Sequence, residues 1–313
     1  MSTEDYDLFG VRPPAPPPRK KASSHTPVVG KVWTEQKSAL IAEYLHRFLL
    51  VTRSGVYIDL FAGPQGERYG GGWSIKRVIE KRDEGPTFRH FAACDNDADQ
   101  IARLEALKKA HSGRPFTFKI YHGDANVLVY NILREAPIRD KTPCFCLIDQ
   151  RTLECDWATV RAVAEYRQQG YKIELFYFLA EGWMDRTWIS TTSPGKLERW
   201  WGRDDHNSFF MLKNVYRAHA LVQRFREEFL YTYVEPWSIQ QKGDGGRTMY
   251  YMIHASDHHD ATRLMAEAHK STRRGSYEYM KPQALFDALP SDGLNTSPDD
   301  GSRGKVWGHK AKK

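Results

Sequence analysis

The sequence has few cysteines and no long apolar run, and both shortages narrow what the chain can be. No two of its four cysteines form a C-x-x-C pair, so the usual spacing of zinc ribbons and dithiol redox sites is absent. No apolar stretch approaches the roughly 18 residues that a membrane-spanning helix needs. The first residues are acidic and proline-rich, unlike a signal peptide. We therefore predict buried, reduced thiols in a cytoplasmic protein that makes no membrane contact. The cysteines are Cys94, Cys144, Cys146 and Cys155.

Acidic residues are also in short supply relative to basic ones. The 313 residues include 46 Lys and Arg but 39 Asp and Glu, which gives a net charge of +7 and a pI of about 9.1. A basic balance favours phosphate-rich partners such as RNA or DNA. Hydrophobic residues make up 41% of the chain, enough to build a core and to exclude wholesale disorder.

The two ends of the sequence differ from the part between them. Residues 1–29 contain the run PPAPPP followed by RKK, and we predict a disordered, basic, proline-rich arm. Residues 291–313 are polar and end in lysines, which predicts a disordered basic tail. We expect residues 30–290 to form the folded domain, which the length allows to be one large α/β unit.

Strand and helix patterns alternate over the first two thirds of this domain. The strands are nearly continuous apolar runs, which are typical of a parallel sheet covered on both faces. Strands are expected at about 55–61, 88–94, 116–121, 144–148 and 172–179, and helices at about 33–50, 74–82, 98–111, 126–135 and 157–169.

After the fifth strand the pattern changes. Residues of about 190–230 predict a helical insert, and the β-rich runs 231–239 and 248–255 flank a KGDGG turn that favours a hairpin. A last helix is expected at about 259–271. The predicted fold class is α/β, with a doubly wound, mostly parallel seven-stranded sheet of the Rossmann-like class I methyltransferase type. It adds an N-terminal helix and places the insert between strands five and six.

The most informative local signal is the run YIDLFAGPQG at 57–66. It combines a buried strand, an acidic residue and a glycine-rich turn, which lets the backbone approach a nucleotide-like ligand at the edge of a parallel sheet. The spacing is not the full dinucleotide G-x-G-x-x-G. It is similar to the first motif of class I methyltransferases that use S-adenosylmethionine. We therefore place a candidate cofactor site at Asp59, Phe61, Ala62, Gly63, Gln65 and Gly66.

Acidic residues follow the first three strands, where parallel sheets bind ligands. Asp59 could hold the turn or reach a methionine amino group through water. Asp95 suits two ribose hydroxyls because a carboxylate accepts two hydrogen bonds, and Asp97 is its rival. Asp124 could accept from an adenine amino group. The alternative is that each acid caps the following helix, but three in register favour a bound S-adenosylmethionine. Their neighbours Asn96 and Ala125 complete the candidate cofactor site.

The end of the fourth strand supplies the candidate catalytic residues, Asp149 and Gln150. Adenine-N6 and cytosine-N4 methyltransferases carry a D-P-P-Y type motif here, whose polar residue accepts from the exocyclic amine and whose aromatic stacks on the extruded base. Asp149 keeps the acceptor, whereas Gln150, Arg151 and Thr152 replace the proline and the aromatic. A stacking platform would have to come from elsewhere, with Phe178, Trp183 and Trp188 as candidates. A loop-capping role for Asp149 is the alternative.

Taken together, these motifs give the chain a family resemblance over about residues 31–270. The chain resembles the three-Cys-motif partner proteins, a bacterial and phage family related to class I methyltransferases. It departs from the family at Asp149, where the family has D-P-[FY]-G, and at Gly72, where the family has G-S-P. The resemblance implies a methyltransferase fold and a protein partner with a cysteine cluster. The matching residues are Lys37, Leu40, Tyr44 and Phe48, the run YIDLFAG, the acid after strand two, Gly123, Asp124, Asp149, Asp156, Trp157, the run LERWWG at 197–202 and the run YYMI at 250–253.

Three other residue groups have simpler explanations than a functional site. The histidines at 254, 258 and 259, with nearby aspartates, lack the orderly spacing of a zinc site, so no metal is predicted. Cys155 has no Pro-Cys context for pyrimidine C5 chemistry. The tryptophans and arginines of the insert fit either a nucleic-acid surface or helix packing, and both stay open.

Three hypotheses follow. The favoured one is a methyltransferase that uses S-adenosylmethionine and acts on a nucleic-acid base. The alternative is a non-catalytic module of the same fold that binds a protein or RNA. The third is a related α/β fold that binds a different nucleotide.

Overall fold

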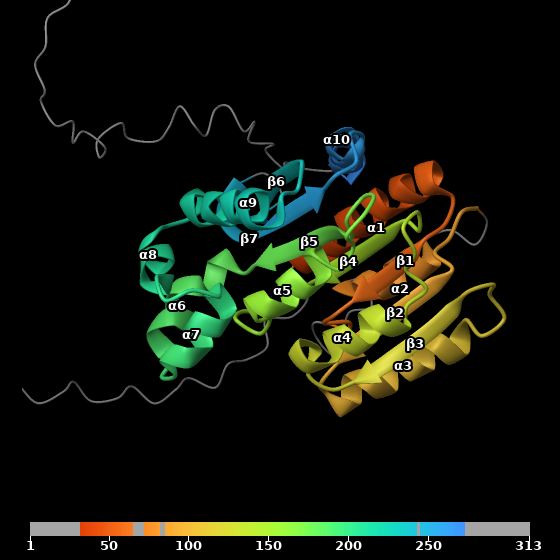
Figure 1. Cartoon of the computed structure of the whole chain (residues 1–313), viewed down its shortest axis with the longest axis horizontal. Helices are drawn as coiled ribbons and strands as arrows, with labels where there is room; N and C mark the ends of the chain where they lie inside the picture. The colour runs from red at the N-terminus through yellow and green to blue at the C-terminus, as the bar shows by residue number, and fades with distance from the viewer. Residues whose placement is uncertain (1–31, 65–71, 82–84, 243–244, 273–313) are drawn as a thin grey trace, which may run out of the picture.

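A seven-stranded sheet organises the molecule (Figure 1). The computed structural model describes residues 32–64, 72–81, 85–242 and 245–272. The predicted arm and tail therefore lie outside the described residues. The sheet has the order β3-β2-β1-β4-β5-β7-β6. The strands are β1 (Val56–Asp59), β2 (His90–Asp95), β3 (Thr117–His122), β4 (Cys144–Ile148), β5 (Glu174–Leu179), β6 (Tyr233–Lys242) and β7 (Gly245–Ser256).

The strand directions confirm the predicted fold class. The first five strands pair in parallel, while β7 runs antiparallel to both β5 and β6. This order, with the hairpin at one edge, is the Rossmann-like class I methyltransferase fold. Strands β1, β4 and β5 are buried along their whole length, as expected for strands covered on both faces.

Two apolar clusters, one on each face of the sheet, hold the helices in place. Helices α1, α2, α3 and α10 contribute to one cluster, and α4, α5, α7, α8 and α9 contribute to the other. The three-layer arrangement buries both faces of the parallel strands. The helices are α1 (Val32–Thr52), α2 (Ser74–Glu80), α3 (Ala98–Ala110), α4 (Ala125–Glu135), α5 (Trp157–Ala164), α6 (Glu181–Ser190), α7 (Pro194–Trp201), α8 (His206–Met211), α9 (Val215–Phe229) and α10 (Ala261–Thr272).

One predicted helix is shorter than expected. The sequence predicts a helix over 157–169, but α5 ends at Ala164. Glu165 and Tyr166 are exposed, and Gly170 takes a positive φ of 75°. The chain therefore leaves the helix where its residues stop facing the core and turns toward β5. The other predicted helices and strands match the observed ones to within a few residues.

The aromatic residues of the insert pack inside the protein. Trp200 and Trp201 are both buried, and Trp201 lies 4.5 Å from Phe209 between ring centroids. Adjacent residues of a helix normally point in different directions, but α8 and Trp157 enclose the second ring. Of the two explanations left open by the sequence, helix packing therefore accounts for this tryptophan pair.

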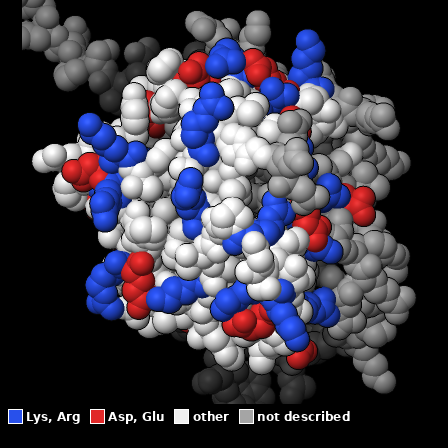
Figure 2. Space-filling model, turned by 90° about the vertical axis from the view of Figure 1, so that its right-hand side faces the viewer, with Lys and Arg blue, Asp and Glu red and all other residues white. Residues whose placement is uncertain are grey.

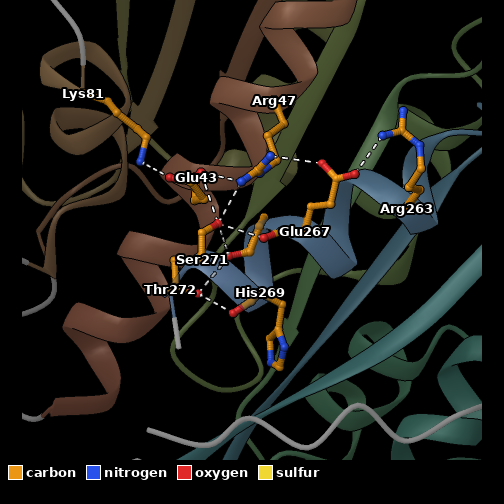
Figure 3. Close-up of polar contacts among 9 residues, drawn as sticks. Glu43, Arg47, Lys81, Arg263, Glu267, His269, Ser271 and Thr272 are labelled. Atoms are coloured by element: carbon orange, nitrogen blue, oxygen red, sulfur yellow. Dashed lines mark hydrogen bonds and ion pairs between the residues drawn. The ribbon is translucent and has the colours of Figure 1, made fainter. Parts of the chain in front are cut away.

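A polar seam joins the first and last described helices, as Figure 3 shows. Arg47 on α1 pairs with Glu43 of its own helix (3.2 Å) and with Glu267 on α10 (3.1 Å). Lys81 also pairs with Glu43. Burial raises the pKa of Glu43, but its ion pairs with these two cations leave that pKa below the ordinary value. The seam fixes α10 against α1 at the rim of their shared apolar contact.

All four cysteines are buried and free, which confirms their predicted burial. Burial raises the pKa of the Cys94 and Cys144 thiols to about 12, and it raises the pKa of Cys155 well above its ordinary value. A nucleophilic role for Cys155 therefore has no support. None of the described helices is both long enough and apolar enough to cross a membrane.

Candidate cofactor and active site

Four acidic residues lie at the carboxyl edge of the parallel strands. Asp59 ends β1 and Asp95 ends β2, while Asp124 and Asp149 follow β3 and β4. These strands are neighbours in the sheet, so their carboxyl ends meet along one edge. The Gly123 amide donates to the carbonyl of Asp95 (2.9 Å), which holds the ends of β2 and β3 together. The structure thus brings the predicted acids to one side of the molecule.

Asp95 holds the glycine turn in place. Its Oδ2 accepts a hydrogen bond from the Gly63 amide (2.8 Å), and its Oδ1 accepts from the Asp97 amide (3.0 Å). A Cβ on Gly63 would lie 2.5 Å from that Oδ2 and 2.6 Å from Gln100. Only glycine fits this position without displacing its neighbours. Each carboxylate oxygen keeps a second lone pair that can accept from a ligand hydroxyl.

Two of the acids cap helices, as the alternative explanation proposed. Asp97 accepts hydrogen bonds from the amides of Asp99 and Gln100 at the start of α3. Both bonds go to Oδ1 of Asp97, which leaves its Oδ2 open, and Asp95 is favoured over it because Asp95 contacts the glycine turn directly through the Gly63 amide. Asp124 accepts from the Asn126 amide (2.8 Å) at the start of α4, where Ala125 is buried. Asp124 is exposed, so its second oxygen can still accept from a ligand.

Asp59 is almost completely buried. Its Oδ2 accepts from the Tyr57 hydroxyl (3.0 Å), and its Oδ1 accepts from the Phe61 amide (3.3 Å). The pKa of Asp59 is raised to about 8, mainly by burial and then by the negative charge of Asp149, with a smaller contribution from Asp95. Asp149 and Asp95 therefore lie close enough to repel a negative charge on Asp59. Such a cluster favours a cation, because an opposite charge relieves the repulsion.

Asp149 forms a buried ion pair that the sequence motif did not reveal. The Lys37 Nζ lies 2.7 Å from Asp149 Oδ1, and the lysine side chain is 0% exposed. The same ammonium group lies 5.0 Å from the centroid of the Phe178 ring and 4.7 Å from that of Tyr250. In the sequence Lys37 stood out only as part of the family resemblance. The position of Lys37 within α1 did not indicate that its side chain would reach Asp149 at the end of β4.

Gln150 organises the loop after β4. Its side chain is fully buried, and its Oε1 accepts from the amides of Glu154 (3.1 Å) and Cys155 (3.0 Å). Its Nε2 donates to the carbonyl of Phe178 (3.4 Å). Both ends of the amide therefore bind protein backbone. The next residue, Arg151, is exposed.

The three candidate stacking residues have different surroundings. Phe178 is fully buried beneath Lys37. Trp188 stacks on Phe210, with the ring planes 14° apart. Trp183 is half-buried and contacts Tyr250 at 5.3 Å between centroids. Of the three, Trp183 keeps exposed surface and also lies beside the rings that surround Lys37.

The residues present fit a sulfonium nucleoside. Asp95 and Asp124 offer acceptors for hydroxyl and amino groups, and the buried acids favour a positive charge. Beside Gly63, the buried Oε1 of Gln100 has no hydrogen-bond partner among the described residues. The predicted cofactor residues Gln65 and Gly66 lie outside the described part of the chain. Asn96 is exposed directly after Asp95.

The histidines at the far end of β7 do not gather around a common point. His254 is buried and lies 3.0 Å from Glu174, and the His258 and His259 rings stack on each other. Across the described ranges, no three His, Cys, Asp or Glu side chains are placed to hold a metal ion.

Comparisons with known proteins give distant structural similarities. No protein-family model matches the chain, and no curated protein matches it. The yhhF protein from Escherichia coli has a TM-score of 0.36 and 8% identity, over 70% of this chain and 86% of that chain. TYW2 from M. jannaschii in complex with AdoMet has a TM-score of 0.33 and 13% identity, over 70% and 75%. Trm5b from Pyrococcus abyssi has a TM-score of 0.31 and 16% identity, over 70% and 48%. Similarity at this level carries no argument about this chain, so the fold assignment rests on the strand order.

Proposed function

We propose that this protein is an S-adenosylmethionine-dependent methyltransferase that acts on a nucleic-acid base. The observation that carries the proposal is the convergence of Asp59, Asp95 and Asp149 at one edge of the sheet. Lys37 balances the charge of Asp149, so the buried Asp59 beside it is costly to ionise unless a further cation arrives. A sulfonium nucleoside offers that cation together with hydroxyl and amino groups that carboxylates bind.

Each acid has a separate binding role in this proposal. Asp95 accepts from the two ribose hydroxyls while its hydrogen bond to Gly63 keeps the turn in place. Asp124 accepts from the adenine amino group through its second oxygen. Asp59 faces the positive charge and loses its proton when that charge arrives. When bound, S-adenosylmethionine supplies an activated methyl group, so what remains for the protein is alignment of the acceptor.

Asp149 is the proposed catalytic residue. Its carboxylate would accept from a nitrogen or oxygen of the acceptor and orient that atom for attack. The ion pair with Lys37 holds the carboxylate in one position. Gln150 is proposed as a positioning residue, because its amide fixes the loop that carries Asp149. Trp183 is the proposed stacking surface for a base.

The nature of the acceptor and partners rests on charge and resemblance. A net charge of +7 favours an anionic polymer such as RNA or DNA. The resemblance to the three-Cys-motif partner family adds a protein partner with a cysteine cluster. Free, buried thiols suit the cytoplasmic location that the sequence predicts.

A non-catalytic module of the same fold is the second candidate function. The Lys37–Asp149 ion pair favours it, since the lysine already occupies one oxygen of the carboxylate. In that case the fold would bind a protein or RNA partner without transferring a methyl group.

Two measurements separate these candidates. A thermal-shift titration of the full chain with S-adenosylmethionine should raise the melting temperature if the cofactor site is real. Transfer of a radiolabelled methyl group to total RNA and total DNA should then occur and should fail for Asp149→Asn. A thermal shift without transfer would support the module, and no shift at all would reject the methyltransferase.

A further inference from the structure

The amino edge of the sheet, opposite the candidate cofactor site, carries four exposed cations. Arg53 precedes β1, Arg89 precedes β2, and Arg139 and Lys141 precede β4. Strands β2, β1 and β4 are consecutive in the sheet, and neighbouring strands lie about 4.8 Å apart. The four side chains therefore start from one short stretch of the sheet edge. We name them the amino-edge cations.

Backbone hydrogen bonds fix the loops that carry these cations. The Arg89 amide donates to the carbonyl of Gly55 (2.9 Å), and the Val56 amide donates to the carbonyl of Pro143 (2.9 Å). The Arg139 amide donates to the Thr142 hydroxyl (3.1 Å). The three loops thus form one connected surface rather than three independent segments.

The amino-edge cations have no acidic partners. In the part of the chain that the structure describes, none of the four side chains makes a hydrogen bond or ion pair. In the loop before β4, Asp140 is exposed between Arg139 and Lys141. Figure 2, which looks onto this edge, shows many Lys and Arg side chains and fewer Asp and Glu. The surface therefore has positive charge to offer an anionic partner.

A cavity opens beside the amino-edge cations. Its volume is about 280 Å³, and its lining includes Lys141, Thr52 and the aromatic rings of Tyr44 and Phe48. Arg53 follows Thr52 directly, so the cavity and the cations share one rim. Typical ligand pockets measure about 300–1,000 Å³, and this one is therefore sized for a single base rather than a dinucleotide.

The cavity offers both stacking and hydrogen-bonding groups. Tyr171, which is 55% exposed, stands at its rim against His258, with 5.4 Å between ring centroids. Glu174 and Asp140 line the cavity. The Glu174 carboxylate already accepts from the Tyr44 and Ser256 hydroxyls and lies 3.0 Å from His254, so the exposed Asp140 is the lining carboxylate that can accept from a ligand. Carboxylates accept hydrogen bonds from base amino groups, and exposed aromatics stack on unpaired bases.

We propose that the amino edge binds single-stranded nucleic acid. The amino-edge cations would contact successive phosphates, and one unpaired base would enter the adjoining cavity with Tyr171 at its rim. A membrane surface offers phosphates but no base to fill the cavity. A rigid duplex keeps its bases stacked and inaccessible to such a pocket. This inference does not depend on the proposed methyl transfer, because the surface lies at the opposite edge of the sheet.

Fluorescence anisotropy with a labelled single-stranded RNA tests this inference on the full chain without cofactor. The edge variant combines Arg53→Gln, Arg89→Gln, Arg139→Gln and Lys141→Gln. The control variant makes the same change of charge on α6, on α7 and in the loop before α9, with Arg186→Gln, Lys196→Gln, Arg199→Gln and Lys213→Gln. The terminal segments are identical in both, so their charge cancels from the comparison.

We expect the edge variant to bind the RNA roughly tenfold more weakly than the unmodified protein near physiological salt. The slope of log affinity against log salt should also fall by about 0.7 for each phosphate that the variant no longer binds. The control variant should bind within about twofold of the unmodified protein, since it keeps the proposed binding groups. Tyr171→Ala should weaken binding about fivefold because it removes the stacking surface, with little change in the salt slope.

Three results would overturn the inference. Equal binding by the edge variant and the unmodified protein would remove the amino-edge cations from the interface. Equal losses of RNA affinity in the edge and control variants would mean that net charge alone, and not this surface, determines binding. Loss of binding to phosphatidylserine vesicles without loss of RNA binding would make the surface a membrane contact. None of these outcomes bears on S-adenosylmethionine binding, which is measured separately.

Discussion

The two edges of the parallel sheet carry opposite charges. Acids gather at the carboxyl edge, where Asp59, Asp95 and Asp149 lie close to one another. Exposed cations gather at the amino edge, where Arg53, Arg89, Arg139 and Lys141 form no ion pair with any of the described acids. Asp59 and Asp149 of the carboxyl edge are buried, whereas the four amino-edge cations are exposed.

Helix geometry explains part of this contrast but not all of it. In a βαβ fold the helices begin at the carboxyl edge, where acids are favoured, and end at the amino edge, where cations are favoured. Asp97 and Asp124 are such N-terminal caps. Asp59 and Asp95 cap no helix, and Arg89 lies in a loop outside any helix. These residues need another explanation, and ligand binding at each edge supplies one.

The largest expected effect comes from breaking the buried ion pair. Lys37→Ala leaves the Asp149 carboxylate without its buried cation, and such a change typically costs about 3–5 kcal/mol of unfolding free energy. Urea denaturation measures the loss. Removing the exposed Lys141 from the opposite edge should cost less than about 0.5 kcal/mol. Equal costs at the two edges would contradict the difference in burial on which the comparison rests.

The free energy of unfolding should depend on pH because the pKa of the buried Asp59 is raised. Between about pH 4 and pH 8 the folded protein keeps a proton on Asp59 that the unfolded chain has released, since the pKa of Asp59 is raised to about 8. Stability should therefore fall as pH rises through this window, by about 1.4 kcal/mol per pH unit, and level off above it. From pH 5 to pH 7 the protein should lose about 3 kcal/mol more than its Asp59→Asn variant. If stability fell equally with pH in the unmodified protein and in Asp59→Asn, the raised pKa would belong to a residue other than Asp59.

The same proton links pH to ligand binding. A cation beside Asp59 favours the ionised carboxylate, so affinity for S-adenosylmethionine should rise with pH up to about 8. Calorimetry in buffers of different ionisation enthalpy should detect the released proton. Asp59→Asn should bind with no such pH dependence.

Overpacking the glycine turn should have the next largest effect. Gly63→Val places side-chain atoms where even a Cβ would meet Asp95 and Gln100 at 2.5 and 2.6 Å. We expect a stability loss of about 2 kcal/mol, together with loss of cofactor binding. Gly113→Val is the matched control, because nothing lies within 4 Å of its Cβ position. A Gly63→Val variant with unchanged stability would mean that the turn is not packed as described.

The sequence predicted the parallel sheet and the acids at its carboxyl edge because both depend on local pattern. Continuous apolar runs mark buried strands, and Asp59, Asp95, Asp124 and Asp149 each end or follow one. The sequence could not predict the partner of Asp149, because Lys37 lies 112 residues away and reaches it only in the folded chain. Helix and strand patterns show which residues share a face of one element, but they do not show which elements pack against each other.

Two further features were beyond a reading of the sequence. The burial of both Trp200 and Trp201 depends on α8 closing over one side of α7, which helical periodicity alone does not reveal. The amino-edge cations are scattered through the chain between Arg53 and Lys141. They form a surface only because the strand order places β2, β1 and β4 side by side.

The smallest expected effect concerns the helix cap next to Asp95. Asp97→Ala removes the hydrogen bonds to the Asp99 and Gln100 amides and should cost about 1 kcal/mol of stability. It should leave affinity for S-adenosylmethionine within about twofold, since the acid serves the helix and not the ligand. Thermal denaturation and calorimetry measure the two quantities. Strong loss of affinity in this variant would reverse the assignment of Asp95 and Asp97.

Calorimetric titration of S-adenosylmethionine into the full chain and its Asp95→Ala variant tests the central claim most directly. The unmodified protein should bind one equivalent. The variant should bind at least roughly 100-fold more weakly, because it lacks two charge-assisted hydrogen bonds to the ribose and the anchor of Gly63. No saturable binding by the unmodified protein, or equal affinity in the variant, would contradict a cofactor site at the carboxyl edge.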